Sequence, residues 1–314
     1  MKKRRIKKSV IKKGIFIVLF LVIVSVVIIS IKVSKYHKTY DYKLKQVGYS
    51  KEEISLLKNE PIDNIEYALG SVYNGQIIDF INEKYYISSN LQRYLSYKEK
   101  NSGSELKDVV AIVNVNRDYD EYTETKKSDI DKNELILVNK YNYLDKDFKP
   151  DDVIDISSRY AYAENQASSK VLDEYIKMFN DAEAAGIKLV ISSSYRDYDN
   201  QDETYNEYLE LYGEDEARKY ASLPGYSEHQ TGLAFDILTL GVLTDDFDKT
   251  EEFKWLRDNS YKYGFILRYP KDKENITGYS YESWHYRYVG VDVAKKIHDE
   301  GITFDEYYAY YVER

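Results

Sequence analysis

Two short segments contain residue types that could together bind a metal ion and move protons. Residues 227–236 read Ser-Glu-His-Gln-Thr-Gly-Leu-Ala-Phe-Asp, and residues 282–285 read Glu-Ser-Trp-His. A catalytic zinc site uses three protein ligands, leaves a coordination position open for water, and depends on a separate carboxylate for proton transfer. The chain has four histidines, and two of them lie in these segments. The residue types therefore predict a zinc hydrolase.

The second of these segments runs into an expected strand over residues 284–289. Alternate side chains of a strand share a face, so His285 and Arg287 point one way and the neighbouring aromatic residues the other. We expect the polar pair to face the site and the aromatic pair to be buried behind it. Glu282 precedes the strand and could reach over the metal from its end.

The elements that must position these residues are short and irregular. Strands are expected over residues 109–113, 135–138, 187–191, 232–238 and 284–289. Helical spacing predicts helices over residues 168–185, 199–212, 251–263, 291–299 and 304–311. This pattern does not fit a doubly wound parallel sheet. It predicts an α+β fold in which helices flank a small, mainly antiparallel sheet.

The N-terminal region has the composition of a membrane anchor. Residues 1–13 hold eight Lys or Arg and no acid, and residues 15–31 are apolar apart from Ser25 and Ser30. With its flanks this segment predicts a transmembrane helix over 14–33, since a hydrocarbon core is roughly 30 Å thick. A cleaved signal peptide is the alternative, but small residues at a cleavage site do not follow. We expect a cytoplasmic basic tail over 1–13, a single span, and a catalytic domain outside the cell.

The remaining composition excludes several classes of protein. The chain has no cysteine, which removes disulfides, thiol catalysis and thiolate zinc sites. The total charge of −9 with a basic tail leaves about −17 on residues 32–314. An acidic domain of this kind is a poor candidate for binding nucleic acid or an anionic membrane surface. The sequence indicates no protein partner.

A polar, partly helical region separates the expected anchor from the catalytic part. Ser50 has a glutamate three positions later, Glu53, and this spacing predicts a capping box at the start of a helix. We expect a small helical stalk over residues 34–107 and a catalytic domain over residues 108–314.

The two chemical segments together match a known family pattern. Ser-x-His-x-x-Gly-x-Ala-x-Asp followed by Glu-x-Trp-His resembles the zinc D,D-peptidases of peptidoglycan, and VanY-type D-alanyl-D-alanine carboxypeptidases in particular. The resemblance covers roughly residue 109 to the C-terminus and includes residues 137–140, residues 193–196 and Gln201. It implies the D,D-peptidase/hedgehog-like fold and one catalytic zinc ion.

Carried over to this sequence, the resemblance implies a role for each site residue. His229, Asp236 and His285 would bind the zinc ion, and Glu282 would be the general base for attack by a zinc-bound hydroxide. Each of the three could also be an ordinary polar residue if taken alone. Their occurrence together is what favours metal binding.

The resemblance also implies residues that contact the substrate. Arg196 would stabilise the developing oxyanion or an adjacent carboxylate, and Ser227 and Gln201 would line the pocket. The alternatives are a surface ion pair for Arg196 and helix-start or turn positions for the other two.

Three functions remain open from the sequence. The first is a D,D-carboxypeptidase that removes the terminal D-Ala from peptidoglycan stem pentapeptides. The second is an L,D-carboxypeptidase that trims tetrapeptide stems, and the third is a non-catalytic wall-binding domain. A D,D-dipeptidase fits an exported chain less well. The third function predicts the loss of a ligand or of the base, and the sequence retains all of them.

Overall fold

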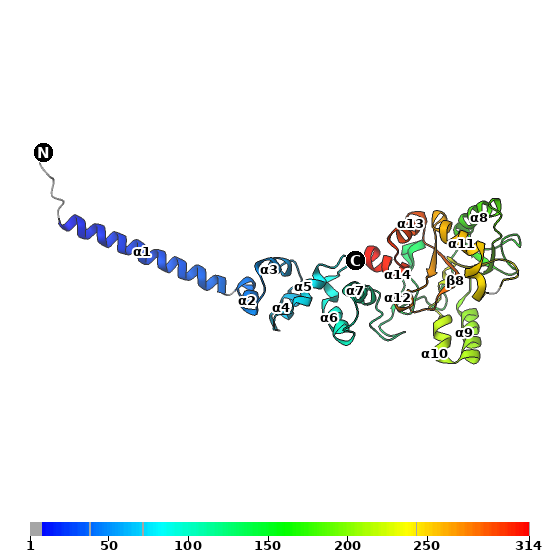
Figure 1. The fold of residues 1–314 in the computed structure, drawn as a ribbon, viewed down its shortest axis with the longest axis horizontal. Helices are drawn as coiled ribbons and strands as arrows, with labels where there is room; N and C mark the ends of the chain where they lie inside the picture. Colours follow the sequence, from blue (N-terminus) through cyan, green and yellow to red (C-terminus); the bar gives the residue numbers. More distant parts are fainter. Residues whose placement is uncertain (1–7, 38, 71, 243, 314) are drawn as a thin grey trace. The chain divides into compact units, whose positions relative to one another are not determined.

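A computed structural model describes residues 8–37, 39–70, 72–242 and 244–313 (Figure 1). The chain divides into two compact units, Met1–Ser102 and Gly103–Arg314. Residues 1–7 of the expected basic tail lie outside the described residues.

The first unit is helical. Its helices are α1 (Lys8–His37), α2 (Tyr40–Val47), α3 (Lys51–Leu57), α4 (Ile62–Gly70), α5 (Gly75–Ile81), the 3₁₀ turn η1 (Ser88–Asn90) and α6 (Leu91–Lys100). The predicted capping box is present at the start of α3. The Ser50 hydroxyl accepts a hydrogen bond from the Glu53 N–H, and the Glu53 carboxylate accepts one from the Ser50 N–H.

The expected transmembrane anchor over residues 14–33 is wrong. Within the part of the chain that the structure describes, no helix combines the length and the apolar character needed to cross a bilayer. The expected single-pass location in the membrane is wrong on the same ground.

The second unit is built on a four-stranded sheet in which all neighbouring strands are antiparallel. The strand order is β5 (Val190–Ser193), β6 (Ala234–Leu238), β8 (Glu282–Tyr288) and β7 (Phe265–Tyr269). Two small sheets lie outside it, one formed by β1 (Lys126–Lys127) with β2 (Asn142–Tyr143), the other by β3 (Val153–Asp155) with β4 (Gln166–Ser168). The unit is therefore a mixture of helices and sheet, and the expected fold class is wrong in its transmembrane element.

Helices surround this sheet. They are α7 (Leu106–Asn114), α8 (Ser169–Ala184), α9 (Tyr198–Tyr212), α10 (Glu214–Tyr220), α11 (Glu251–Asn259), α12 (Glu274–Thr277), α13 (Val291–Glu300) and α14 (Phe304–Tyr307). Short turns complete the unit: η2 (Ile130–Leu135), η3 (Glu228–Thr231), η4 (Thr244–Lys249), η5 (Ser260–Tyr263) and the π turn η6 (Tyr308–Val312).

The main core lies between α8 and the sheet. Helix α8 is amphipathic, and its buried residues belong to the same apolar cluster as residues of β5, β6 and β8. Tyr175 of α8 packs edge-on against Phe235 of β6, with ring centroids 5.5 Å apart. Burying one face of the central strands in this way leaves their other face for polar side chains.

Two expected strands are absent from the described residues, and five strands were not expected, namely β1 to β4 and β7. Residues 109–113 belong to helix α7, and residues 135–138 leave η2 in an irregular extended path. Strand β7 was missed, although it forms one edge of the sheet. The expected helix over 304–311 consists of α14 followed by the π turn η6.

Candidate active site

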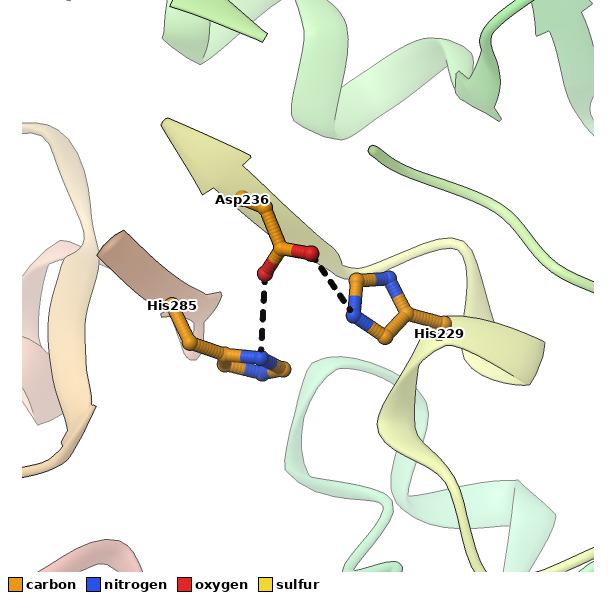
Figure 2. A group of neighbouring side chains, drawn as sticks. All are labelled: His229, Asp236 and His285. Carbon is orange, nitrogen blue, oxygen red and sulfur yellow. Dashed lines mark ion pairs between the residues drawn. The ribbon is translucent and has the colours of Figure 1, made fainter. Parts of the chain in front are cut away.

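Three potential metal ligands converge from three elements of the second unit (Figure 2). His229 lies in η3, Asp236 in β6 and His285 in β8. Asp236 and His285 are paired residues in the antiparallel ladder, so their side chains leave the same face of the sheet. One possible ligand atom from each of the three residues lies within 4.8 Å of the others. The sequence prediction that these residues meet agrees with this geometry.

The distances around Asp236 fit a shared cation. Its Oδ2 atom lies 3.5 Å from His229 Nε2, and its Oδ1 atom lies 3.3 Å from His285 Nδ1. Oδ1 is buried and has no hydrogen-bond partner among the described residues. Two imidazole nitrogens and one carboxylate oxygen form a ligand set that zinc accepts. The residues present therefore fit a zinc ion.

The two histidines face Asp236 with different ring nitrogens. His229 Nδ1 lies 2.6 Å from the carbonyl oxygen of Ser194, so it donates its proton there and leaves Nε2 free to bind a metal. His285 has the opposite arrangement, because its Nε2 atom points at the Glu228 carboxylate, 3.6 Å away, and its Nδ1 atom faces Asp236. In each ring one nitrogen faces Asp236. The other nitrogen faces an acceptor oxygen, that of Ser194 for His229 and that of Glu228 for His285.

The local sequence explains how His229 reaches this position. The Ser227 hydroxyl accepts the His229 N–H and so caps η3. Gly232 ends the turn with φ of 68°, and a Cβ atom there would lie 3.2 Å from the Ser168 nitrogen. Glycine allows both the left-handed conformation and this close approach, after which the chain enters β6.

Glu282 lies at the start of β8, beside the three ligand-type side chains. Its Oε2 atom is 3.5 Å from His285 Nδ1, and the residue is buried. Burial raises the pKa of Glu282 to about 8, and the neighbouring Asp236 carboxylate adds to the rise. Burial alone would lower the pKa of His285, but the carboxylates of Asp236 and Glu228 outweigh it and raise that pKa to about 9.

Arg196 lies in the same pocket as Glu282 and His285. Its guanidinium donates to Gln201 Oε1 and to Ser193 Oγ, both at 2.9 Å. Gln201 and Ser227 also line this pocket. The Gln201 amide donates to the Ser222 carbonyl oxygen at 2.8 Å, so it holds Arg196 from a fixed position.

The expected division of side chains between the two faces of β8 is present. Tyr286 is fully buried in the main core and Trp284 packs against that core. Arg287 leaves the opposite face with His285, but it contacts Glu228 and lies outside the residues that line the pocket.

Sequence reasoning missed Glu228, which contacts both His285 and Arg287. Glu228 is the unspecified position between Ser and His at the start of the family pattern, so the pattern gives it no role. The sequence offers no local signal for this role, because the residues beside Glu228 are polar and their burial appears only in the structure.

Comparison with known proteins finds similarity to carboxypeptidases. The family model VanY, D-alanyl-D-alanine carboxypeptidase, matches residues 164–291. YodJ of Bacillus subtilis (strain 168), a candidate carboxypeptidase by name, is 41% identical over 189 residues, which are 56% of this chain and 67% of YodJ. The match thus spans about two thirds of that relative.

Solved structures of carboxypeptidases are also similar to this chain. The LD-carboxypeptidase LdcB is 38% identical, with a TM-score of 0.56 over 60% of this chain and 91% of that one. A mutant of the D,D-pentapeptidase VanY from a VanB-type resistance cassette, in complex with Zn(II), is 34% identical. Its TM-score is 0.50, over 55% of this chain and 98% of that one.

Proposed function

The chain belongs to the VanY family of D-alanyl-D-alanine carboxypeptidases, a family of zinc enzymes, and we propose that it removes the terminal D-Ala from peptidoglycan stem pentapeptides. The observation that carries this proposal is the convergence of two histidines, an aspartate, a buried glutamate and an arginine in and around one pocket. We assign the activity to residues 108–314 and a helical stalk to residues 34–107.

We propose that His229, Asp236 and His285 hold the zinc ion. Their burial and mutual distances support this assignment, as does the unpartnered Oδ1 atom of Asp236. When bound, zinc acidifies a water molecule and polarises a carbonyl group. The aspartate also balances part of the ion's charge, since its pKa is held well below the ordinary range despite burial.

Glu282 is the proposed general base. It takes a proton from the water that attacks the carbonyl carbon of the scissile amide. It then gives that proton to the leaving nitrogen as the C–N bond breaks, so the free D-Ala departs as an amine. A carboxyl group that must both accept and return a proton near neutral pH needs a raised pKa, and burial provides one.

Arg196 is proposed to bind negative charge on the substrate. A guanidinium presents a planar fork of N–H groups that suits a carboxylate or a developing oxyanion. Gln201 and Ser193 fix two of its nitrogens, so the orientation of the fork is set before substrate arrives. Ser227 and Gln201 are proposed as the polar lining of the pocket, and both also have the structural contacts described above.

An L,D-carboxypeptidase that trims tetrapeptide stems is the second candidate. It is favoured by the similarity to LdcB, whose identity of 38% exceeds the 34% of the VanY structure. Both reactions would use the same zinc ligands and base. They differ in the stereocentre before the scissile bond.

Incubation of the full chain with pentapeptide and tetrapeptide stems, followed by mass spectrometry, tests the proposal. We expect zinc-dependent release of D-Ala from the pentapeptide, and loss of this activity by about 10²–10⁴ in Glu282→Gln. Release from the tetrapeptide alone would favour the L,D reaction. Zinc binding without any product would favour a wall-binding module.

A further inference from the structure

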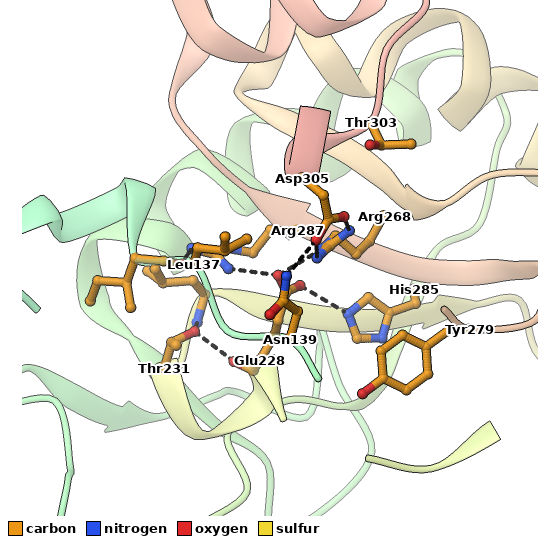
Figure 3. Close-up of polar contacts among 12 residues, drawn as sticks. Leu137, Asn139, Glu228, Thr231, Arg268, Tyr279, His285, Arg287, Thr303 and Asp305 are labelled. Carbon is orange, nitrogen blue, oxygen red and sulfur yellow. Dashed lines mark hydrogen bonds and ion pairs between the residues drawn. The ribbon is translucent and has the colours of Figure 1, made fainter. Parts of the chain in front are cut away.

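A buried cluster of charged residues lies directly behind His285 (Figure 3). Glu228, Arg268, Arg287 and Asp305 are each at most 3% exposed. Arg268 Nε and Arg287 Nη1 both donate to Glu228 Oε1, at 2.7 and 2.9 Å. Arg268 also donates to both oxygens of Asp305, at 2.5 and 3.2 Å. Two arginines thus face two carboxylates, which balances the charge of the cluster.

The remaining oxygen of Glu228 points at the metal centre. Oε2 lies 3.6 Å from His285 Nε2, slightly beyond hydrogen-bonding range. Both atoms are buried, and neither has another hydrogen-bond partner among the residues that the structure describes. A buried N–H without an acceptor is unfavourable, so these two atoms are each other's natural partner.

The cluster holds Glu228 in one place. Arg287 donates through Nη2 to the carbonyl oxygens of Glu134 and Ile136, at 2.9 and 2.7 Å, and through Nε to its neighbour Tyr288. Arg268 is fixed from the other side by Asp305, which in turn accepts from Asn139 Nδ2 at 2.8 Å. The carboxylate is therefore clamped between groups from β7, β8, α14 and the irregular segment after η2.

We propose that Glu228 is a positioning residue for the metal centre, accepting the Nε2 proton of His285 so that Nδ1 of this ring is presented to the zinc ion. Metal-binding histidines depend on such a partner for their tautomer and ring orientation. Arg268, Arg287 and Asp305 act through Glu228 by fixing its carboxylate. This inference rests on the proposed function, because it assumes that His285 is a zinc ligand.

Zinc affinity of the full chain measures this role directly. We expect Glu228→Gln to bind zinc 10–100-fold more weakly in competition with a chelator, because an amide oxygen is a weaker acceptor than a carboxylate. The matched control is Glu306→Gln, a buried carboxylate of α14 that accepts from the Thr303 N–H. It should bind zinc within about threefold of the unchanged protein. Equal affinity in Glu228→Gln and the unchanged protein overturns the proposal.

A second measurement needs no variant and covers the case in which Glu228→Gln does not fold. The chain has four histidines, so ¹⁵N spectra of the histidine-labelled, zinc-loaded protein are simple enough to assign. We expect opposite tautomers, with the proton on Nδ1 in His229 and on Nε2 in His285. A proton on Nδ1 of His285 overturns the proposal.

The same experiments separate this inference from the function on which it rests. An unchanged protein that binds no zinc and releases no D-Ala refutes the proposed function. An unchanged protein that binds zinc and is active, but has the wrong His285 tautomer or an unaffected Glu228→Gln variant, refutes the inference alone.

Discussion

His285 lies between two buried polar regions that differ in how fully they are satisfied. The ligand cluster on its Nδ1 side brings two carboxylates, Asp236 and Glu282, within 3.5 Å of one imidazole. Within the described part of the chain, Asp236 Oδ1 has no hydrogen-bond partner. The ion cluster on its Nε2 side pairs its two carboxylates, Glu228 and Asp305, with two arginines through short hydrogen bonds.

This difference indicates that the ion cluster has a structural role and that the ligand cluster is where a metal ion and substrate would react. A buried charge is tolerated when its partners are nearby and is costly when they are missing. In the ion cluster two arginines balance two carboxylates, and Glu228 Oε2, the oxygen without a hydrogen-bond partner among the described residues, faces His285, so the cluster can fix positions. In the ligand cluster the buried Asp236 Oδ1 has no hydrogen-bond partner among the described residues, so a bound cation would complete it. The following predictions test this contrast, from the largest expected effect to the smallest.

Arg268→Met should produce the largest loss of stability. It leaves Glu228 and Asp305 buried with too little positive charge, which typically costs 3–5 kcal/mol in the free energy of unfolding. Arg257→Met is the control, because its ion pair with Asp258 is exposed and should contribute little to the free energy of unfolding. Urea unfolding followed by tryptophan fluorescence measures both. Similar losses in the two variants would contradict the view of a buried scaffold.

Arg196→Lys should reduce kcat/KM by about 10²–10³ while leaving the fold intact. Lysine keeps the positive charge but loses the planar fork that Gln201 and Ser193 hold in place. Arg159→Lys, at an exposed ion pair with Glu183, is the matched control and should keep full activity. Peptide hydrolysis assays measure both. An active Arg196→Lys variant would show that the orientation of this cation does not matter.

Zinc should stabilise the unchanged protein because it completes the ligand cluster. A ligand that binds only the folded state adds about 2.7 kcal/mol at a concentration of 100 Kd. Thermal unfolding with zinc and with chelator measures the difference. Asp236→Ala should lose most of it, because two imidazoles remain where three ligands were. A zinc effect of equal size in this variant would place the ion elsewhere.

The sequence indicated which side chains come together at the candidate site more reliably than it indicated the elements around them. Residues 109–113 form a short apolar run, and such a run fits a buried strand or a buried helix equally well. Helix α7 buries Val109 through Asn114 almost continuously, so no periodicity was visible. Residues 135–138 make no strand because the side chains of Arg287 and Ser128 donate to the carbonyl oxygens of Ile136 and Leu137.

The proposed ligand residues could be recognised in the sequence because histidines are few in this chain and two of them lie close to acidic residues. Two of four histidines occur near acidic residues in two short segments, and a family pattern connects them. The ion cluster had no such signal. Arg268 binds both Glu228 and Asp305, which are far from it in the sequence, and strand β7, which carries Arg268, was itself not expected. Contacts of this kind depend on tertiary structure and not on local spacing.

Glu282→Gln should show the smallest of these effects on stability, and it should depend on pH. The pKa of Glu282 is about 8 in the folded protein and about 4.5 when unfolded. Between these values the folded state holds a proton that the unfolded state lacks, so the free energy of unfolding falls as pH rises. Glutamine does not titrate. In the metal-free protein the variant should therefore gain about 2 kcal/mol on the unchanged protein between pH 5 and pH 7.

Urea unfolding in the presence of chelator, at both pH values, measures this gain. The two tryptophans, Trp255 and Trp284, both lie in the second unit, so their fluorescence reports on the part of the chain that holds the site. Glu203→Gln, which removes an exposed carboxylate of α9, controls for the change in net charge. If the free energy of unfolding changes equally with pH in Glu282→Gln and in the unchanged protein, the Glu282 carboxylate is already stabilised without a metal. The ligand cluster would then be as complete as the ion cluster, and the contrast between the two sides of His285 would disappear.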